Sequence, residues 1–390
     1  MRACRSGWRT LVIMAALTVL LASLPEGATT SDGGAGLVVH EWGTFTSVLG
    51  DDGLPLTWRP FTASDDLPGF VYRQGPFHAE ARRDWRSIKT TLSAPARLET
   101  PVLYFYADRP LSVAARVRFP SGRITEWYPQ AHVTGAGIGW DAVEVLPGAG
   151  GGFPDEGTPS HYYAARETDA ASLRVEAGGG PQEERFLFYR GVGNVELSVG
   201  AALDRHRVAV RALHPGVSEI VLFESRNGHV GYSIQNLGKR RATFARPLVA
   251  GDVSALKSEL ESILVRHGLY PREATAMVAT WGDSWFEEGT RLFYVLPRAL
   301  ADRALPLTVL PRPRETARVL VARLELIARE DEDRVRAELD AVPDATALTS
   351  PEREELRVRL GRFGEPTLRR LRDHTRDPLI LAKIDALLAP

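Results

Sequence analysis

Residues 97–235 form a succession of short segments in which apolar and polar side chains alternate, separated by turns that contain Gly or Pro. In residues 113–119, Val113, Ala115, Val117 and Phe119 alternate with one Ala and two Arg. Because alternate side chains of a strand share a face, this pattern buries one face and leaves the other wet, as in antiparallel sheets. Many short strands joined in this way predict an antiparallel, β-sandwich-like body.

The pattern changes near Asp252, which can cap a helix. Apolar residues then recur at helical spacing as far as His267, and Gly268 supplies a helix stop. Pro271 is well suited to the first position of a second helix. A helical pair is therefore expected after the β-rich body.

Beyond the helical pair, residues 297–314 are rich in Pro and Arg. Residues 319–327 alternate and predict a strand. Ser350, Glu365 and Asp377 each precede a Pro, a pattern typical of helix starts. The predicted class is α+β: the sandwich-like body, the helical pair and a C-terminal helical appendage.

Two local predictions concern shorter segments. Residues 37–49 and 54–58 are expected to pair as a β-hairpin around the turn residues Asp51, Asp52 and Gly53. Residues 161–167 are expected to form a strand.

The N-terminus predicts export. Arg2, Arg5 and Arg9 precede an apolar run at residues 11–24, which is typical of a signal peptide. We assign residues 1–28 to this leader, 29–36 to a linker, 37–250 to the β-rich domain, 251–312 to the helical pair with a returning loop and strand, and 313–390 to a strand and the C-terminal helices. The leader would attach the protein to a membrane only if it stays uncleaved.

The only cysteine, Cys4, lies within the leader. An exported chain without further Cys has no disulfides, so its core alone must hold the fold. Cys-ligated metals and thiolate nucleophiles are excluded in the same way, and a metal would need His, Asp or Glu. The formal net charge of -1 provides no field that would attract nucleic acid. No cofactor is indicated.

The first candidate site lies in residues 38–46, which combine His40, Glu41 and Trp42 with Gly and Thr. His40 and Glu41 are candidate catalytic groups, His40 also as a metal ligand, and Trp42 is a candidate binding residue. In a strand, however, His40 and Glu41 face opposite sides. The alternative is a structural strand in which His40 hydrogen-bonds within the fold and Glu41 pairs with an Arg.

The second candidate site lies in residues 281–291. Aromatic faces that stack on sugar rings, together with carboxylates that act as acid and base, would suit a carbohydrate. The alternative is a loop whose aromatic residues fill the junction between sheet and helices. The candidate catalytic residues are Asp283, Glu287 and Glu288, and the candidate binding residues are Trp281, Trp285 and Arg291.

A metal site is a weaker hypothesis. His78 and Glu80 could join His40 as imidazole and oxygen ligands, and His132 and His161 could add to them. Chance spacing of an ordinary number of His residues is the alternative. No Ser occupies a Gly-x-Ser-x-Gly turn, which disfavours a hydrolase of that type.

Four stretches carry a family resemblance: residues 39–46, 99–106, 185–191 and 281–298. With these, the chain resembles an uncharacterised family of exported bacterial proteins marked by a His-Glu-Trp-Gly-Thr-Phe signature, here residues 40–45. The resemblance spans most of the chain through about Arg298. It implies export from a bacterial cell and no particular activity.

The sequence therefore predicts a periplasmic, cell-envelope or secreted protein that binds a partner without catalysis. The partner is unidentified, and a polysaccharide or other envelope polymer is one candidate. The alternative is a hydrolase of such a polymer, metal-assisted or not, that uses His40, Glu41 and the loop from Asp283 to Glu288. Convergence of His40 or Glu41 with the acidic loop would favour the enzyme.

Overall fold

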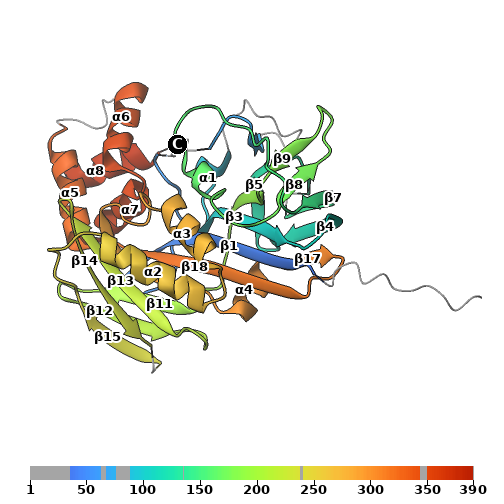
Figure 1. Ribbon diagram of the computed structural model, residues 1–390. Helices are drawn as coiled ribbons and strands as arrows, with labels where there is room; N and C mark the ends of the chain where they lie inside the picture. Colours follow the sequence, from blue (N-terminus) through green and yellow to red (C-terminus); the bar gives the residue numbers. More distant parts are fainter. Residues whose placement is uncertain are drawn as a thin grey trace, which may run out of the picture. The chain divides into compact units, whose positions relative to one another are not determined.

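The computed structural model describes residues 36–62, 67–75, 88–134, 136–237, 240–342 and 349–389. The predicted leader at residues 1–28 and nearly all of the linker at residues 29–36 lie outside these ranges, as do His78 and Glu80. The chain is an α+β protein (Figure 1). In the described part of the chain, no helix combines the length and the apolar character needed to span a membrane.

A nine-stranded sheet forms the centre of the fold. Strands from the predicted ranges 37–250, 251–312 and 313–390 all enter it. Its strands, in spatial order, are β14 (His229–Asn236), β13 (Glu219–Arg226), β16 (Gly289–Val295), β18 (Glu315–Leu326), β1 (Val38–Leu49), β3 (Ala96–Tyr106), β10 (Leu187–Gly193), β5 (Gly122–Tyr128) and β2 (Tyr72–Arg73).

The middle strand β1 is buried along its whole length. It pairs in parallel with β18 and antiparallel with β3. β3 bulges where Gly43 of β1 faces two residues, Thr100 and Pro101. Proline lacks the amide hydrogen that a regular ladder requires, so a bulge accommodates it. The bulge places Glu99 directly opposite Thr44.

Two smaller sheets pack against one face of the nine-stranded sheet. Their buried residues, such as Val117 and Val208, belong to the same hydrophobic cluster as Val39 and Phe45 of β1. We call this cluster the sheet-side core. The smaller sheets contain β11 (Val199–Leu203), β12 (Arg207–Ala212) and β15 (Arg241–Ala245), and β17 (Leu307–Leu310), β4 (Leu111–Arg118), β7 (Gly137–Leu146), β8 (Ser172–Val175) and β9 (Gln182–Glu184), with β6 (His132–Val133) paired to β7.

Helices cover the opposite face: α1 (His161–Ala164), α2 (Ser254–Arg266) and α3 (Pro271–Thr280). α2 buries Leu256, Leu260, Ile263 and Leu264 of the predicted stripe, whereas His267 lies at its C-cap and is exposed. The helix begins after Val253, and the Asp252 side chain accepts a hydrogen bond from the Ser254 amide at 2.7 Å. Trp42 of β1 belongs to the cluster beneath these helices, which we call the helix-side core. Figure 1 shows α2 and α3 side by side across the sheet.

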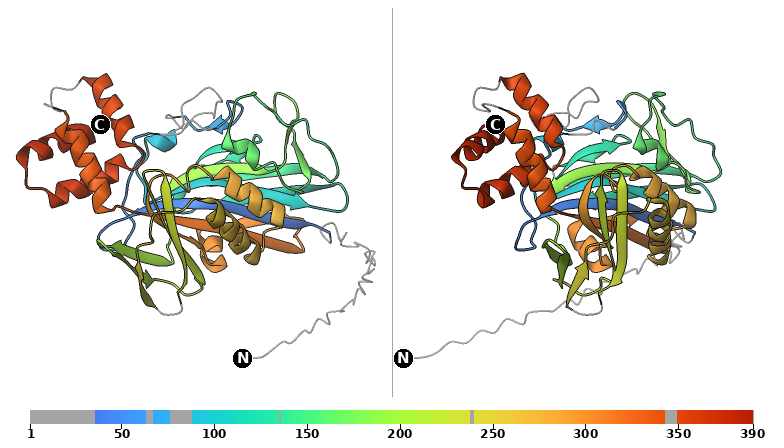
Figure 2. Two further views of the ribbon diagram at one scale, coloured as in Figure 1. Left: turned by 60° about the vertical axis from the view of Figure 1, so that its left-hand side comes forward. Right: turned by 90° about the vertical axis from the view of Figure 1, so that its left-hand side faces the viewer.

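The remaining helices are η1 (Ile88–Thr90), α4 (Arg298–Ala304), α5 (Arg329–Asp340), α6 (Ser350–Leu360), α7 (Gly364–His374) and α8 (Pro378–Leu388). α5 to α8 gather at one end of the large sheet (Figures 1 and 2) and have their own core, which includes Leu356, Leu368 and Ile384. Asp377 caps α8 by accepting hydrogen bonds from the Leu379 and Ile380 amides at 3.0 and 3.4 Å.

Two local predictions were wrong in extent or type. The hairpin at residues 37–58 is reduced to the turn itself, with the bridge from Leu49 to Pro55 and the Leu56 amide donating to the Val48 carbonyl at 2.8 Å, because β18 and β3 take both edges of β1. Residues 161–164 form α1 rather than a strand, with the Ser160 side chain accepting from the Tyr162 amide as N-cap. The Pro- and Arg-rich residues 297–314 contain α4 and β17.

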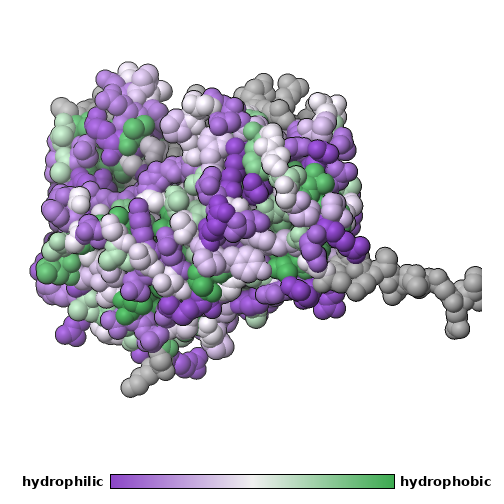
Figure 3. All heavy atoms as spheres, in the orientation of Figure 1, coloured by the Kyte–Doolittle hydropathy of each residue, from purple (hydrophilic) through white to green (hydrophobic). Residues whose placement is uncertain are grey.

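The surface in Figure 3 carries its hydrophobic residues scattered among hydrophilic ones. Isolated exposed apolar residues are normal for a soluble surface. Buried polar groups are therefore more informative about function here than surface apolar ones.

Candidate binding site on the helix-covered face of the sheet

The two residues of the His40-Glu41 pair point to opposite faces of the sheet. Glu41 contacts Tyr189, a member of the sheet-side core. His40 contacts Glu273 of α3, which lies on the helix-covered face. Strand alternation therefore separates the pair, as the sequence predicts.

Glu41 lies in a buried ionic network. The Tyr189 hydroxyl donates to Glu41 Oε1 at 2.5 Å, and Arg318 Nε donates to Glu41 Oε2 at 2.5 Å. Arg318 Nη1 continues to Asp302 at 2.7 Å. Burial opposes the charge on Arg318, but the Glu41 carboxylate outweighs burial and raises the pKa of Arg318. The network joins β1, β10, β18 and α4, which is a structural role.

His40 forms a buried dyad with Glu273, since Nδ1 lies 2.6 Å from Glu273 Oε2. The ring contacts Tyr106 and Tyr270 at centroid distances of 5.3 and 4.5 Å. Among the described residues, Nε2 has no hydrogen-bond partner. Burial, together with the Glu273 carboxylate, raises the pKa of Tyr106. Sequence reasoning missed Glu273, because 233 positions separate it from His40.

Further along β1, buried donors without acceptors gather in the helix-side core. Trp42, Trp281 and Trp285 all belong to this core, and the last two stack with centroids 6.5 Å apart. In the described part of the chain, the three indole Nε1 atoms are buried and unpartnered. The hydroxyl oxygens of Thr44 and Ser284 are likewise buried and have no hydrogen-bond partner among the described residues. An indole N–H can only donate, so this group lacks acceptors.

Arg291 fixes the loop that follows α3. Its Nη1 and Nη2 donate to the carbonyl oxygens of Trp285 and Glu288 at 2.7 and 2.9 Å. Its Nε lies 3.0 Å from Glu325 Oε1. Burial lowers the pKa of this fully buried guanidinium to about 10, and Glu325 limits the decrease. Arg291 is thus a positioning residue for the tryptophan loop.

A layer of charged side chains adjoins the orphan donors on the same face. Thr44 lies opposite Glu99, and Thr46 lies opposite Arg97 on one side and Arg323 on the other. We call this set the charged layer. Its described members are Lys89, Arg97, Glu99, Glu126, Arg190, Glu287, Arg291, Arg323, Glu325 and Arg362.

Ion pairs connect the charged layer across five elements and loops. Lys89 Nζ lies 2.6 Å from Glu99 Oε2, and Arg362 donates to the other oxygen of Glu99. Arg323 Nε donates to Glu325 at 2.5 Å, while its Nη2 reaches Glu287. Burial alone would raise the pKa of Glu99, but Lys89 and Arg362 outweigh it and lower this pKa well below its usual value. Burial lowers the pKa of Lys89 to about 8.

The three candidate acidic residues of the loop separate. Asp283 is exposed and lies 2.9 Å from His161 Nε2, Glu287 belongs to the charged layer, and Glu288 is exposed. None of the described contacts joins them to His40 or Glu41. The structure therefore brings Glu287 of the loop to Arg323 of β18 rather than to the His-Glu pair.

Among the described residues, no three His, Cys, Asp or Glu side chains gather as a metal site. His78 and Glu80 lie outside the described residues, and His132 is an exposed residue of β6. His40 has Glu273 as its one described carboxylate neighbour at hydrogen-bond distance.

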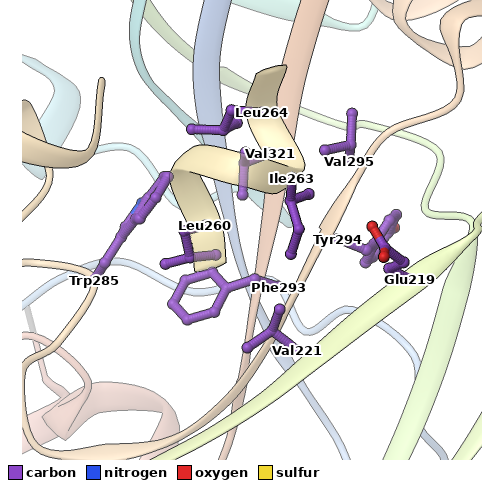
Figure 4. A pocket seen from close by; sticks show the side chains of 10 residues that line it. All are labelled: Glu219, Val221, Leu260, Ile263, Leu264, Trp285, Phe293, Tyr294, Val295 and Val321. Carbon is purple, nitrogen blue, oxygen red and sulfur yellow. The ribbon is translucent and has the colours of Figure 1, made fainter. Parts of the chain in front are cut away.

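A small pocket lies between α2 and the sheet (Figure 4). It is lined by apolar side chains such as Leu260, Phe293 and Val321. Trp285 lines one side. The charged lining residue, Glu219, is already paired with Arg266 at 2.9 Å. The pocket therefore offers apolar contact and no free charge.

Comparison with known proteins gives no relative: no family model matches this chain, and no curated protein is similar to it.

Proposed function

We propose that this protein is exported and binds a ligand without catalysing a reaction, through the orphan donors beside Thr44. The proposal rests on one observation: three tryptophans of the helix-side core, Trp42, Trp281 and Trp285, each have a buried indole N–H without a described partner. The hydroxyls of Thr44, on the same strand as Trp42, and of Ser284, beside Trp285 in sequence, are also buried and unpartnered among the described residues. Buried polar atoms normally have partners, and each exception requires an explanation such as a ligand or bound water.

The chemistry of these atoms defines the ligand in outline. Three indole N–H groups need acceptors, so the ligand carries acceptor oxygens. Trp281 and Trp285 are 6% and 0% exposed. A long polysaccharide cannot stack on rings buried to this degree, so the envelope partner proposed from the sequence would enter as a small unit or a chain end.

Two further proposals, on family and on architecture, accompany the binding function. We propose membership of the His-Glu-Trp-Gly-Thr-Phe family on the motif at residues 40–45. We also propose that the layering of the smaller sheets on the large one is sandwich-like. Both proposals are compatible with an exported binding protein.

Tryptophan fluorescence tests the binding function. We expect acceptor-rich small molecules, such as sugars, acidic sugars and dicarboxylates, to change the emission of the wild-type protein. Trp42→Phe should reduce this change, because it removes one of the donors. Trp140→Phe is the matched control, since the Trp140 indole is buried in the other core and already donates to the Pro129 carbonyl at 3.1 Å. An equal response from both variants would exclude the proposed site.

A hydrolase is the second candidate function, and the His40–Glu273 dyad favours it. A carboxylate on Nδ1 orients an imidazole and leaves Nε2 able to accept a proton. If this function holds, His40→Gln should abolish release of nitrophenol from nitrophenyl esters or glycosides, while the exposed His132→Gln should not. Equal rates for the two variants would eliminate the dyad as a base.

A further inference from the structure

The charged layer carries more positive than negative charge among its described members. Lys89, Glu126 and Arg190 have further contacts beyond those given above, so we leave them aside. Four guanidinium groups then face three carboxylates: Arg97, Arg291, Arg323 and Arg362 against Glu99, Glu287 and Glu325. Arg97, Arg291 and Arg323 are at most 2% exposed.

An uncompensated buried charge is unfavourable in a medium of low polarity. Arg97 illustrates the effect, since burial lowers its pKa to about 10 even though Glu99 lies nearby. Its two described hydrogen bonds go to the carbonyl oxygens of Leu92 and Lys89, which carry no net charge. The layer is therefore complementary to an anion.

Thr44 provides an independent observation. It is 0% exposed, and its Oγ1 has no hydrogen-bond partner among the described residues. It faces the charged layer, because it lies opposite Glu99 on β3 and shares its face with Thr46, which lies opposite Arg323 on β18. Both oxygens of Glu99 are already engaged, by Lys89 and by Arg362. The Thr44 hydroxyl can therefore donate to an additional acceptor.

Arg362 marks the route by which an anion would enter. It lies in the connection between α6 and α7, and 21% of its side chain is exposed. The guanidinium groups of Arg362 and Arg323 both pack on the Phe363 ring, at 5.5 and 5.4 Å from its centroid. Phe363 thus holds a partly exposed cation close to a buried one.

We propose that the charged layer binds a small oxyanion (a phosphate, sulfate or carboxylate group), held by Arg323 and Arg362 with the Thr44 hydroxyl as donor. This inference rests on the proposed binding function and specifies the ligand class. Guanidinium groups form strong, directional hydrogen bonds with such oxygens. The shared chemistry fits a free anion and an anionic group on a larger envelope molecule equally.

The test measures thermal unfolding and calorimetric binding of the purified full chain with sodium phosphate, sodium sulfate and sodium succinate. Sodium chloride at equal ionic strength is the salt control. We expect a rise in Tm with at least one oxyanion at about 10 mM, since a ligand that binds only the folded state stabilises it. The anion that binds best distinguishes phosphate, sulfate and carboxylate sources.

Three variants assign the site. Thr44→Val keeps the shape and removes the orphan hydroxyl, so it should raise the Tm without anion and weaken binding by about tenfold. Arg362→Gln should weaken binding to a similar degree. Arg372→Gln, which removes another ion-paired arginine of the same helical region, should leave binding unchanged; Arg372 lies 3.1 Å from Asp385.

The outcomes separate this inference from the binding function. If no oxyanion binds, or if Thr44→Val and Arg372→Gln bind it alike, the anion site is wrong. If a neutral sugar then changes the tryptophan emission of the wild type and Trp42→Phe loses this change, the binding function survives without the anion. If neither kind of probe acts, both proposals fail.

Discussion

At the scale of single residues, the two members of the His-Glu pair have different physical roles. Glu41 accepts hydrogen bonds from Tyr189 and Arg318 in the interior. His40 instead lies within hydrogen-bond distance of Glu273, and its ring contacts Tyr270. Breaking a buried ion pair leaves the remaining charge uncompensated, which is costlier than losing a surface pair. Their contributions to stability can therefore be measured separately.

Glu41→Gln should lower the free energy of unfolding by about 3 kcal/mol, because Arg318 would lose its buried carboxylate partner and keep only the half-exposed Asp302. Urea unfolding measures this change. Glu196→Gln is the control; Glu196 pairs with Arg303, and both side chains are more than half exposed. Its loss should stay below about 1 kcal/mol. Similar losses for both variants would contradict the structural role of Glu41.

At the scale of elements, sequence periodicity predicted the helices that depend on nearby residues. It failed for strand pairings that depend on segments distant in the sequence. The stripe of α2 and the Pro271 start of α3 are as expected, since they depend on residues a few positions apart. The hairpin after β1 was wrong because the ladder of β18, beginning 266 residues beyond β1, takes that edge instead. No local pattern reveals a parallel partner so distant in sequence.

The candidate site shows the same division. Trp281 and Trp285 do lie close together after α3, where the density of polar and aromatic residues indicated a site, and Arg291 of β16 holds this loop in place. The charged layer was missed, because charged residues are normally exposed. One indication was available: Arg323 and Glu325 interrupt the otherwise apolar residues 319–326 of β18, and such inward charges need partners.

Arg291→Lys tests the loop as a unit. A lysine cannot satisfy the Trp285 and Glu288 carbonyls and Glu325 together, since its ammonium is a single point. We expect a loss of about 2 kcal/mol in unfolding free energy and faster amide hydrogen exchange at residues 282–289. Arg298→Lys is the control, because Arg298 is half exposed on α4. Unchanged exchange in Arg291→Lys would show that the loop does not depend on the guanidinium.

At the scale of the whole molecule, the C-terminal helices are fastened to the body by charge. His374 of α7 lies 3.1 Å from Glu332 of α5 and 2.9 Å from Asp51, which follows β1. Arg370 pairs with the same two carboxylates. The hydrogen bond to Glu332, with a smaller effect from Asp51, raises the pKa of His374.

Stability should therefore depend on pH through His374. A raised pKa in the folded state means that the contribution is complete below the ordinary pKa of His, 6.5, and is lost as pH rises through the folded value. The urea concentration at which half of the protein is unfolded should decrease as the pH rises from about 6 to about 8. His374→Gln should flatten this decline, and His132→Gln should not. If the stability of His374→Gln decreases with pH as much as that of the wild type, other titrating groups must cause the decrease.

The parallel pairing of β1 with β18 also governs when the sheet can form. β1 is among the first described segments to be synthesised, yet its edge stays open until residue 326 has been made. Contacts between segments so distant in the sequence form slowly, because closing the long intervening loop costs entropy before the contacts can stabilise the fold. An apolar strand with an unpaired edge invites wrong pairing in the meantime. The large sheet can therefore be completed only after β18, near the C-terminal end of the described chain, has been synthesised.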